Sequence, residues 1–172
     1  MIPYVVLFTA LGILVGVLYS VPPFRFRKTA YTPFMNFAVG AVPVLIVAAF
    51  FNEFSINLLT LVLLIGVTTA VKSLYEDLAD YNSDFASGSR TVPIIFGLRK
   101  GLLITIIMGY SLIPMMVLVG ILFQLNWIYY VTTLFKQLLA NDPGKAILGT
   151  SGGMGGTRVN LAYRSIGRNL FA

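Results

Sequence analysis

The sequence predicts an all-α membrane protein, a multi-helix transmembrane bundle of about five spanning helices. Of its 172 residues, 58% are hydrophobic and only 10% are charged, and the mean hydropathy is +0.88. A soluble domain carries about 25% charged residues, so this chain has too few charges to cover a globular surface in water. The apolar residues also fall in long uninterrupted blocks rather than in short alternating runs, which is typical of membrane-spanning helices.

Five apolar blocks define the predicted helices. They cover residues 2–21, 34–51, 56–71, 102–123 and 127–140. The first four approach the ~20 residues that cross the hydrocarbon core, and the helix of the third block can extend further. The fifth block is shorter and carries Lys136, whose long side chain is expected to reach the interface. Residues 1–140 are therefore predicted to form the bundle, and the Gly-rich residues 141–172 a cytosolic loop and tail.

The basic residues predict the orientation of the bundle. If five helices span the membrane, all 12 Lys and Arg residues fall on one side, and the opposite links near 52–55 and 124–126 contain none. Basic loops face the cytoplasm in most membrane proteins, which accounts for the net charge of +6 without a nucleic-acid partner. We expect a multi-pass protein of the cell membrane with its charged side in the cytoplasm. Residues 2–21 lack a positive n-region, so they do not resemble a signal peptide.

Cysteine and histidine are both absent from the chain. Disulfides, zinc or haem sites built on these residues, and Ser–His or Cys–His catalysis are therefore excluded. A metal would need oxygen ligands, which favours Mg²⁺, Ca²⁺ or Mn²⁺. The glycines between 149 and 156 lack the Gly-Lys-Ser/Thr ending of a phosphate-binding loop, so they indicate a plain loop.

An acidic stretch follows the third block. If the helix continues, Asp77, Asp80 and Asp84 share one face at spacings i, i+3 and i+7. Like charges at these spacings destabilise an isolated helix, and a divalent cation such as Mg²⁺ would compensate them. The alternative is a solvated acidic loop. In both cases Gly88 is expected to end a turn and Pro93 to open the next helix.

A basic stretch follows the first block. Pro22 and Pro23 are expected to stop that helix at the membrane surface, and Arg25, Arg27 and Lys28 come next. Such a cluster can bind phosphate through charge-assisted hydrogen bonds, although positive-inside bias with an aromatic interface belt is the simpler alternative. Because both stretches lie on the same predicted side, together they indicate an anionic lipid or a diphosphate ligand.

The two stretches resemble the signatures of the UbiA superfamily of intramembrane prenyltransferases. The acidic stretch is similar to its second aspartate-rich motif, D-x-x-D-x-x-x-D-x-x-x-G-x-x-T-x-P, which is matched by Asp77, Asp80, Asp84, Gly88, Thr91 and Pro93. The stretch 19–28 resembles Y-S-x-P-P-x-R-x-K, except that Arg27 stands at the lysine position and Lys28 follows it. The resemblance covers roughly residues 1–123.

The resemblance implies a nine-helix fold around a cavity that opens to the cytosol, with two aspartate-rich motifs that bind Mg²⁺ and an isoprenyl diphosphate. The first of these motifs, of the type N-x-x-x-D, is absent because no acidic residue precedes Tyr19. The chain is therefore expected to correspond to about helices four to eight of nine. We expect it to be incomplete and inactive when it is expressed alone.

The implied function is Mg²⁺-dependent transfer of an isoprenyl group from a prenyl diphosphate to an aromatic, quinone-precursor or lipid acceptor within the membrane. Asp80 and Asp84 would be catalytic metal ligands, supported by Asp77. The expected diphosphate-binding residues are Tyr19, Arg25, Arg27, Lys28, Lys72 and Arg90. Two alternatives stay open: a non-catalytic fragment or assembly partner, and a cation-binding transport subunit. The second is less favoured, because its acids would lie deep within the helices.

Overall fold

A computed structural model describes residues 2–140 of the chain as helices and short connections, with no strand among them. The elements are α1 (Ile2–Ser20), η1 (Phe26–Lys28), α2 (Thr32–Phe51), α3 (Ile56–Ala79), α4 (Tyr81–Ala86), α5 (Val92–Phe96), α6 (Leu98–Leu122) and α7 (Trp127–Ala140). The predicted all-α membrane bundle is confirmed. The predicted Gly-rich loop and tail, 141–172, lies outside the described residues.

Four helices are long and apolar enough to cross a membrane: α1, α2, α3 and α6. The fifth predicted span corresponds to α7, which has 14 residues. At 1.5 Å per residue it is about 21 Å long, shorter than the ~30 Å hydrocarbon core. The part of the chain that the structure describes therefore contains four clear spans and one shorter helix that packs on α6.

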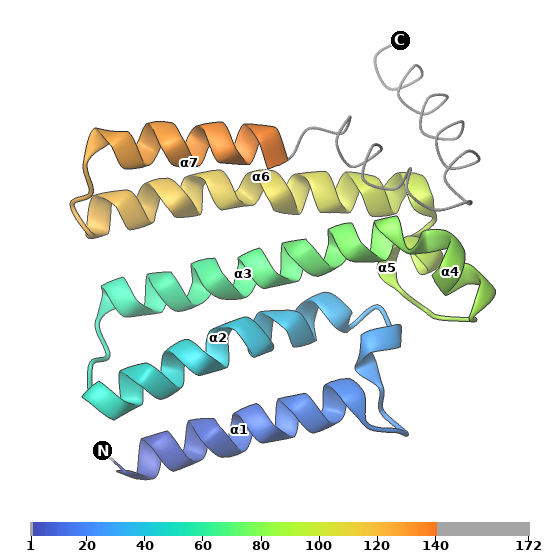
Figure 1. Ribbon diagram of the computed structural model, residues 1–172, viewed down its shortest axis with the longest axis horizontal. Coiled ribbons are helices and arrows are strands. Elements are labelled where there is room, and N and C mark those ends of the chain that lie inside the picture. Colours follow the sequence, from blue (N-terminus) through green and yellow to red (C-terminus); the bar gives the residue numbers. More distant parts are fainter. Residues whose placement is uncertain (1, 141–172) are drawn as a thin grey trace.

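The long helices lie side by side and antiparallel, in chain order, as a thin layer with α1 at one edge and α7 at the other (Figure 1). Contacts join each helix to the next: α1 to α2, α2 to α3, α3 to α6 and α6 to α7. Most large side chains on α1 point outward, and few residues of this helix are buried. Such an apolar exterior suits a lipid environment rather than water.

One end of the layer gathers all the long connections, and we call it the polar end. The last turns of α1 and α3 and the first turns of α2 and α6 meet there with η1, α4 and α5 (Figure 1). Within residues 2–140, the connections at the opposite end are two short turns, after α2 and after α6, and α1 begins at this end too (Figure 1). The basic stretch and the acidic stretch therefore lie at the same end, as the sequence predicted.

Close packing between α2 and α3 fixes the middle of the layer. A side chain at Gly40 would clash with the hydroxyl of Thr69, and a Cβ at Gly66 would lie 2.6 Å from the ring of Phe37. Small residues let two membrane helices approach closely and exchange interhelical hydrogen bonds. Here the Thr69 hydroxyl lies 2.8 Å from the backbone carbonyl of Asn36 on α2 and 2.8 Å from that of Gly66 on its own helix, so its one proton can be donated to either. The polar ends of α2 and α3 are thereby held next to each other.

The third helix extends beyond its apolar block, to Ala79, but it does not continue unbroken through Asp84. Asp80 lies at the junction with α4, at φ −89° and ψ 7°. Asp, Asn and Ser side chains compete for backbone hydrogen bonds, and this segment contains all three types. A hydrogen bond of 2.9 Å from the Asp84 amide to the Asp80 carbonyl nevertheless preserves the helical spacing across the junction.

The residues expected to end or begin helices do so in the structure. Helix α4 ends where Gly88 adopts φ 71°, with its amide donating to the Phe85 carbonyl at 3.3 Å. The Ser89 amide donates to the Asp84 carbonyl at 3.0 Å, and this pair of bonds defines a Schellman motif. Pro93 stands at the start of α5, and α1 ends at Ser20, just before the two prolines.

Candidate functional site

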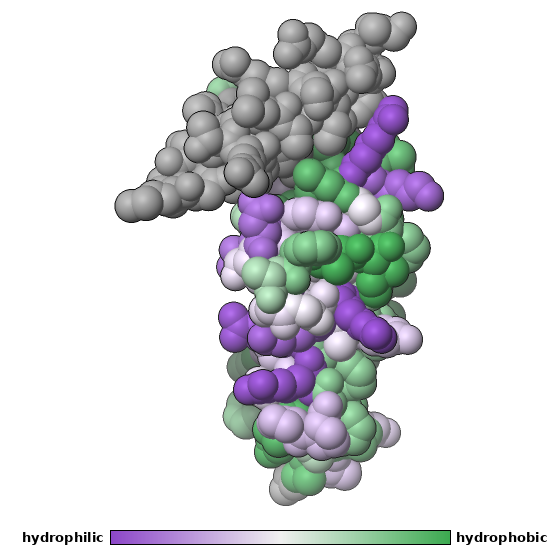
Figure 2. All heavy atoms as spheres, turned by 90° about the vertical axis from the view of Figure 1, so that its right-hand side faces the viewer, coloured by the Kyte–Doolittle hydropathy of each residue, from purple (hydrophilic) through white to green (hydrophobic). Residues whose placement is uncertain are grey.

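A cavity of about 420 Å³ opens at the polar end between α1, α2, α3 and α4. Its size falls within the range of small-molecule sites. Figure 2 views the layer from this end and shows hydrophilic side chains among apolar ones. The cavity is lined by Tyr19, Ser20, Arg25, Arg27, Lys28, Thr32, Asn36, Ser73, Glu76, Asp77, Asp80 and Asp84. The acidic and basic stretches, more than 40 residues apart in the sequence, therefore line one space.

The acidic wall of the cavity comprises Glu76, Asp77, Asp80 and Asp84. Asp77 is the buried member, with 8% of its surface exposed, and its Oδ2 atom has no hydrogen-bond partner. Burying a carboxylate oxygen without a partner is costly. A partner from outside the described residues, such as a cation, would offset this cost.

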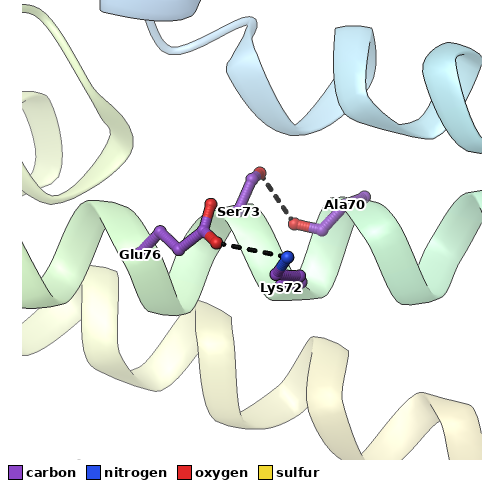
Figure 3. A network of polar contacts seen from close by, with 4 residues as sticks. All are labelled: Ala70, Lys72, Ser73 and Glu76. Atoms are coloured by element: carbon purple, nitrogen blue, oxygen red, sulfur yellow. Dashed lines mark hydrogen bonds and ion pairs between the residues drawn. The ribbon is translucent and has the colours of Figure 1, made fainter. Parts of the chain in front are cut away.

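Glu76 belongs to this wall but already has a cationic neighbour. Lys72 lies one turn earlier on α3, and its Nζ atom is 3.5 Å from Oε1 of Glu76 (Figure 3). Both side chains are largely exposed, so the pair contributes little to stability. Lys72 does not line the cavity. Lys72 was a predicted diphosphate-binding residue, but the structure places it beside the acidic wall and outside the cavity.

The basic wall comprises Arg25, Arg27 and Lys28, with Tyr19 beside them on the last turn of α1. All three cationic side chains are exposed. Arg90 is different: it is exposed and does not line the cavity, while its backbone amide donates to the Lys28 carbonyl at 2.9 Å. Four of the six predicted diphosphate-binding residues therefore line the cavity, and Lys72 and Arg90 do not.

Several lining residues were missed by sequence reasoning. Ser73 and Glu76 lie one helical turn before Asp77 and Asp80, so extending the aspartate stripe backwards would have found them. Thr32 and Asn36 were missed as well, whereas Ser20 belongs to the stretch 19–28 that resembles the family signature. Thr32 and Asn36 carried no sequence signal, because they reach the cavity only through the packing of α2 on α3.

The lining suits Mg²⁺ in its donor atoms but does not form a complete metal site. Among residues 2–140, no three acidic side chains come close enough together to hold an ion. The predicted ligand set of Asp77, Asp80 and Asp84 is thus not preassembled. Mg²⁺ commonly uses one or two carboxylates together with phosphate oxygens and water, and the unpartnered Oδ2 of Asp77 is compatible with that mode.

The fold and the site define a class: integral membrane proteins in which a charged cavity opens at one end of an apolar helical layer. The sequence model of the UbiA prenyltransferase family matches residues 2–140, and the chain belongs to this family. Searches among curated proteins and among solved structures found no match. By its family, the chain is a prenyltransferase-type integral membrane protein.

Proposed function

We propose that the cavity binds the diphosphate of a prenyl diphosphate and supports transfer of its isoprenyl group to a hydrophobic acceptor in the membrane. The observation that carries this proposal is that both charged walls line a single space. An anionic lipid in general would need only the basic wall. The facing carboxylates are explained by a ligand that arrives with divalent cations.

The balance of charge in the lining supports a requirement for Mg²⁺. The cavity is lined by three cationic and four acidic side chains, and Lys72 lies beside one of the acids, Glu76, so the charges of the two walls nearly balance. The lining alone would therefore leave most of the negative charge of a prenyl diphosphate uncompensated. Bound Mg²⁺ would supply positive charge that stabilises the departing diphosphate. Asp77, Asp80 and Asp84 are the residues that would hold it.

The other residues have roles that follow from their chemistry. Arg25, Arg27 and Lys28 would bind the terminal phosphate oxygens, and arginine can do so through two parallel hydrogen bonds. Tyr19, which lines the cavity from the last turn of α1, would donate one more hydrogen bond through its hydroxyl. The prenyl chain would lie along apolar helix faces, which exclude water from the carbon left electron-poor as the C–O bond breaks. An aromatic, quinone-precursor or lipid acceptor would then attack that carbon and lose a proton to the departing diphosphate or to water.

The proposal places the polar end in the cytoplasm of a cell-membrane protein. Within residues 2–140, every Lys and Arg other than Lys136 lies at or near the polar end, whereas the turn after α2 carries only Glu53. Basic residues mark the cytoplasmic side of membrane proteins. The diphosphate group and Mg²⁺ would then reach the cavity from the cytosolic side.

One acidic wall is expected to bind diphosphate but not to complete the transfer. We propose that productive ionisation requires a second acidic motif, because charge must be stabilised on both sides of the bond that breaks. The experiment is co-expression of the full chain with a membrane segment that carries an N-x-x-x-D motif, followed by an assay for labelled lipid-soluble product. Mg²⁺-dependent product only from the pair is expected. Product from the chain alone would contradict the need for a second motif, and no product from any pairing would contradict the proposed transfer.

A further inference from the structure

The loops that carry the two walls are joined by main-chain hydrogen bonds. The amide of Arg90 donates to the carbonyl of Lys28 at 2.9 Å, and Thr29 pairs with Arg90 in an isolated parallel bridge. The next residue back, Ser89, donates its amide to the Asp84 carbonyl at 3.0 Å. A short length of hydrogen-bonded backbone therefore connects a cation of the basic wall to a carboxylate of the acidic wall.

Thr32 contacts the turn that carries Arg27 and Lys28, which we call the basic loop, through its side-chain hydroxyl. It is the first residue of α2, and only 3% of its surface is exposed. Its hydroxyl oxygen lies 2.9 Å from the Phe26 carbonyl, 3.1 Å from that of Arg27 and 2.6 Å from that of Thr29. A hydroxyl has one proton, so it donates to one of these carbonyls at a time. The turn that carries Arg27 and Lys28 is nevertheless folded around this single group.

We propose that Thr32 is a positioning residue for diphosphate binding, which it supports by holding Arg27 and Lys28 opposite the acidic wall. The inference rests on the proposed function. Long cationic side chains on a free loop would lose conformational freedom on binding, and a loop that is already ordered reduces that loss. The bond between Lys28 and Arg90 then fixes the spacing of the two walls, since it ties both loops together.

The test measures binding of inorganic pyrophosphate with Mg²⁺ to the purified full chain by calorimetry. Thr32→Val keeps the shape and removes the donor, Thr32→Ser keeps the donor, and Thr60→Val is the matched control. Thr60 is also buried, and its hydroxyl donates to the Ile56 carbonyl at 2.9 Å in the first turn of α3, away from the polar end. Thr32→Val should weaken binding by about five- to tenfold, because the ligand must then order a loop that the lost hydrogen bond had ordered in advance. Thr32→Ser and Thr60→Val should stay within about twofold of wild type.

Because Thr32 also lines the cavity, a direct contact with the ligand must be separated from positioning. If Thr32 acts through the cations, Thr32→Val should add little to a variant that already carries Arg27→Gln and Lys28→Gln. In the otherwise wild-type chain, Thr32→Val should also make pyrophosphate affinity depend less on salt concentration, because Arg27 and Lys28 would no longer be held close to the ligand. Additive losses would indicate a direct contact and would overturn the positioning role, as would wild-type binding by Thr32→Val.

Hydrogen exchange in the wild-type chain gives a test that needs no variant. The Arg90 amide should be protected before pyrophosphate is added, because its bond to Lys28 is already formed. Rapid exchange that slows only with ligand would show that the loops are not held in advance, and would overturn the proposal. A wild-type chain that binds no pyrophosphate but protects the Arg90 amide would instead refute the proposed function while leaving the joined loops intact.

Discussion

The two ends of the helical layer connect their helices differently: one end uses short turns, and the other uses longer connections that contain short helices. At the opposite end, α2 joins α3 and α6 joins α7 through short turns in which Asn52 and Gln124 adopt left-handed conformations, at φ 56° and 50°. At the polar end, α1 joins α2 through η1, and α3 joins α6 through α4 and α5. A short turn with a few backbone hydrogen bonds is enough to reverse the chain between two helices. The additional residues in the connections of the polar end therefore need another explanation. Ligand binding provides one, since long structured connections are often functional.

The two ends are expected to face opposite sides of the membrane, which gives an all-or-none prediction. The chain has no cysteine, so Arg27→Cys, Ser87→Cys and Asn52→Cys each introduce a single thiol. An impermeant thiol reagent applied from the cytosolic side should label positions 27 and 87, and one applied from the other side should label position 52. Labelling of positions 27 and 52 from the same side would rule out the proposed orientation.

Acidic residues at the two ends should differ strongly in their effect on transfer in a complete enzyme. Asp80→Asn or Asp84→Asn should lower the rate by about 10²–10³, since losing a charge partner of the transition state commonly costs a few kcal/mol. Glu53→Gln, at the opposite end, should leave the rate nearly unchanged. Product formation at saturating prenyl diphosphate measures the difference. Near-normal rates in both Asp variants would mean that the acidic wall is an ordinary solvated loop end.

Two arginines within the polar end are expected to differ in their contribution to binding. Arg27 lines the cavity, whereas Arg90 contributes only its backbone amide to the joined loops. Arg27→Gln should weaken pyrophosphate binding by about tenfold, because a charge-assisted hydrogen bond contributes about 1.5–3 kcal/mol. Arg90→Gln keeps the amide and should change affinity by less than about twofold. Equal losses in the two variants would place the Arg90 side chain in the site after all.

The smallest expected effect concerns the turns themselves. Gly88 ends α4 at φ 71° with open space where a side chain would be, so Gly88→Ala should destabilise the protein by about 1–2 kcal/mol through backbone strain alone. At the opposite end, Gln124→Gly relieves the same strain and should stabilise by about 0.5 kcal/mol. Thermal unfolding in detergent measures both changes. A stabilising Gly88→Ala would contradict the left-handed turn.

Much of the fold was predictable because each membrane-spanning helix corresponds to a long apolar block in the sequence. Four predicted blocks became spanning helices, and Pro22, Gly88 and Pro93 marked helix boundaries through rules that depend only on local geometry. The break at Asp80 was not predicted. The spacing of Asp77, Asp80 and Asp84 suits a continuous helix, but the competing Asp, Asn and Ser side chains interrupt it.

The candidate site was predictable only where charge and helical period carried the signal. The carboxylates and the basic stretch could be found in this way, and the structure brings them to one cavity. Thr32 and Asn36 could not be found, because their roles depend on how closely Gly40 lets α2 approach α3. Lys72 and Arg90 carry the right charge but lie outside the cavity, since sequence position does not determine the direction of a side chain.

Both walls are expected to hold one ligand, and binding of labelled geranylgeranyl diphosphate to the purified full chain tests this expectation. Binding should require Mg²⁺, and it should weaken about tenfold or more both in Asp80→Asn and in Arg27→Gln, whereas Glu53→Gln should bind like the wild type. Combining the first two changes should cost less than the sum of their separate effects, because they disrupt one shared site. Binding that is independent of Mg²⁺ and unchanged in both variants would show that the two walls do not hold one ligand.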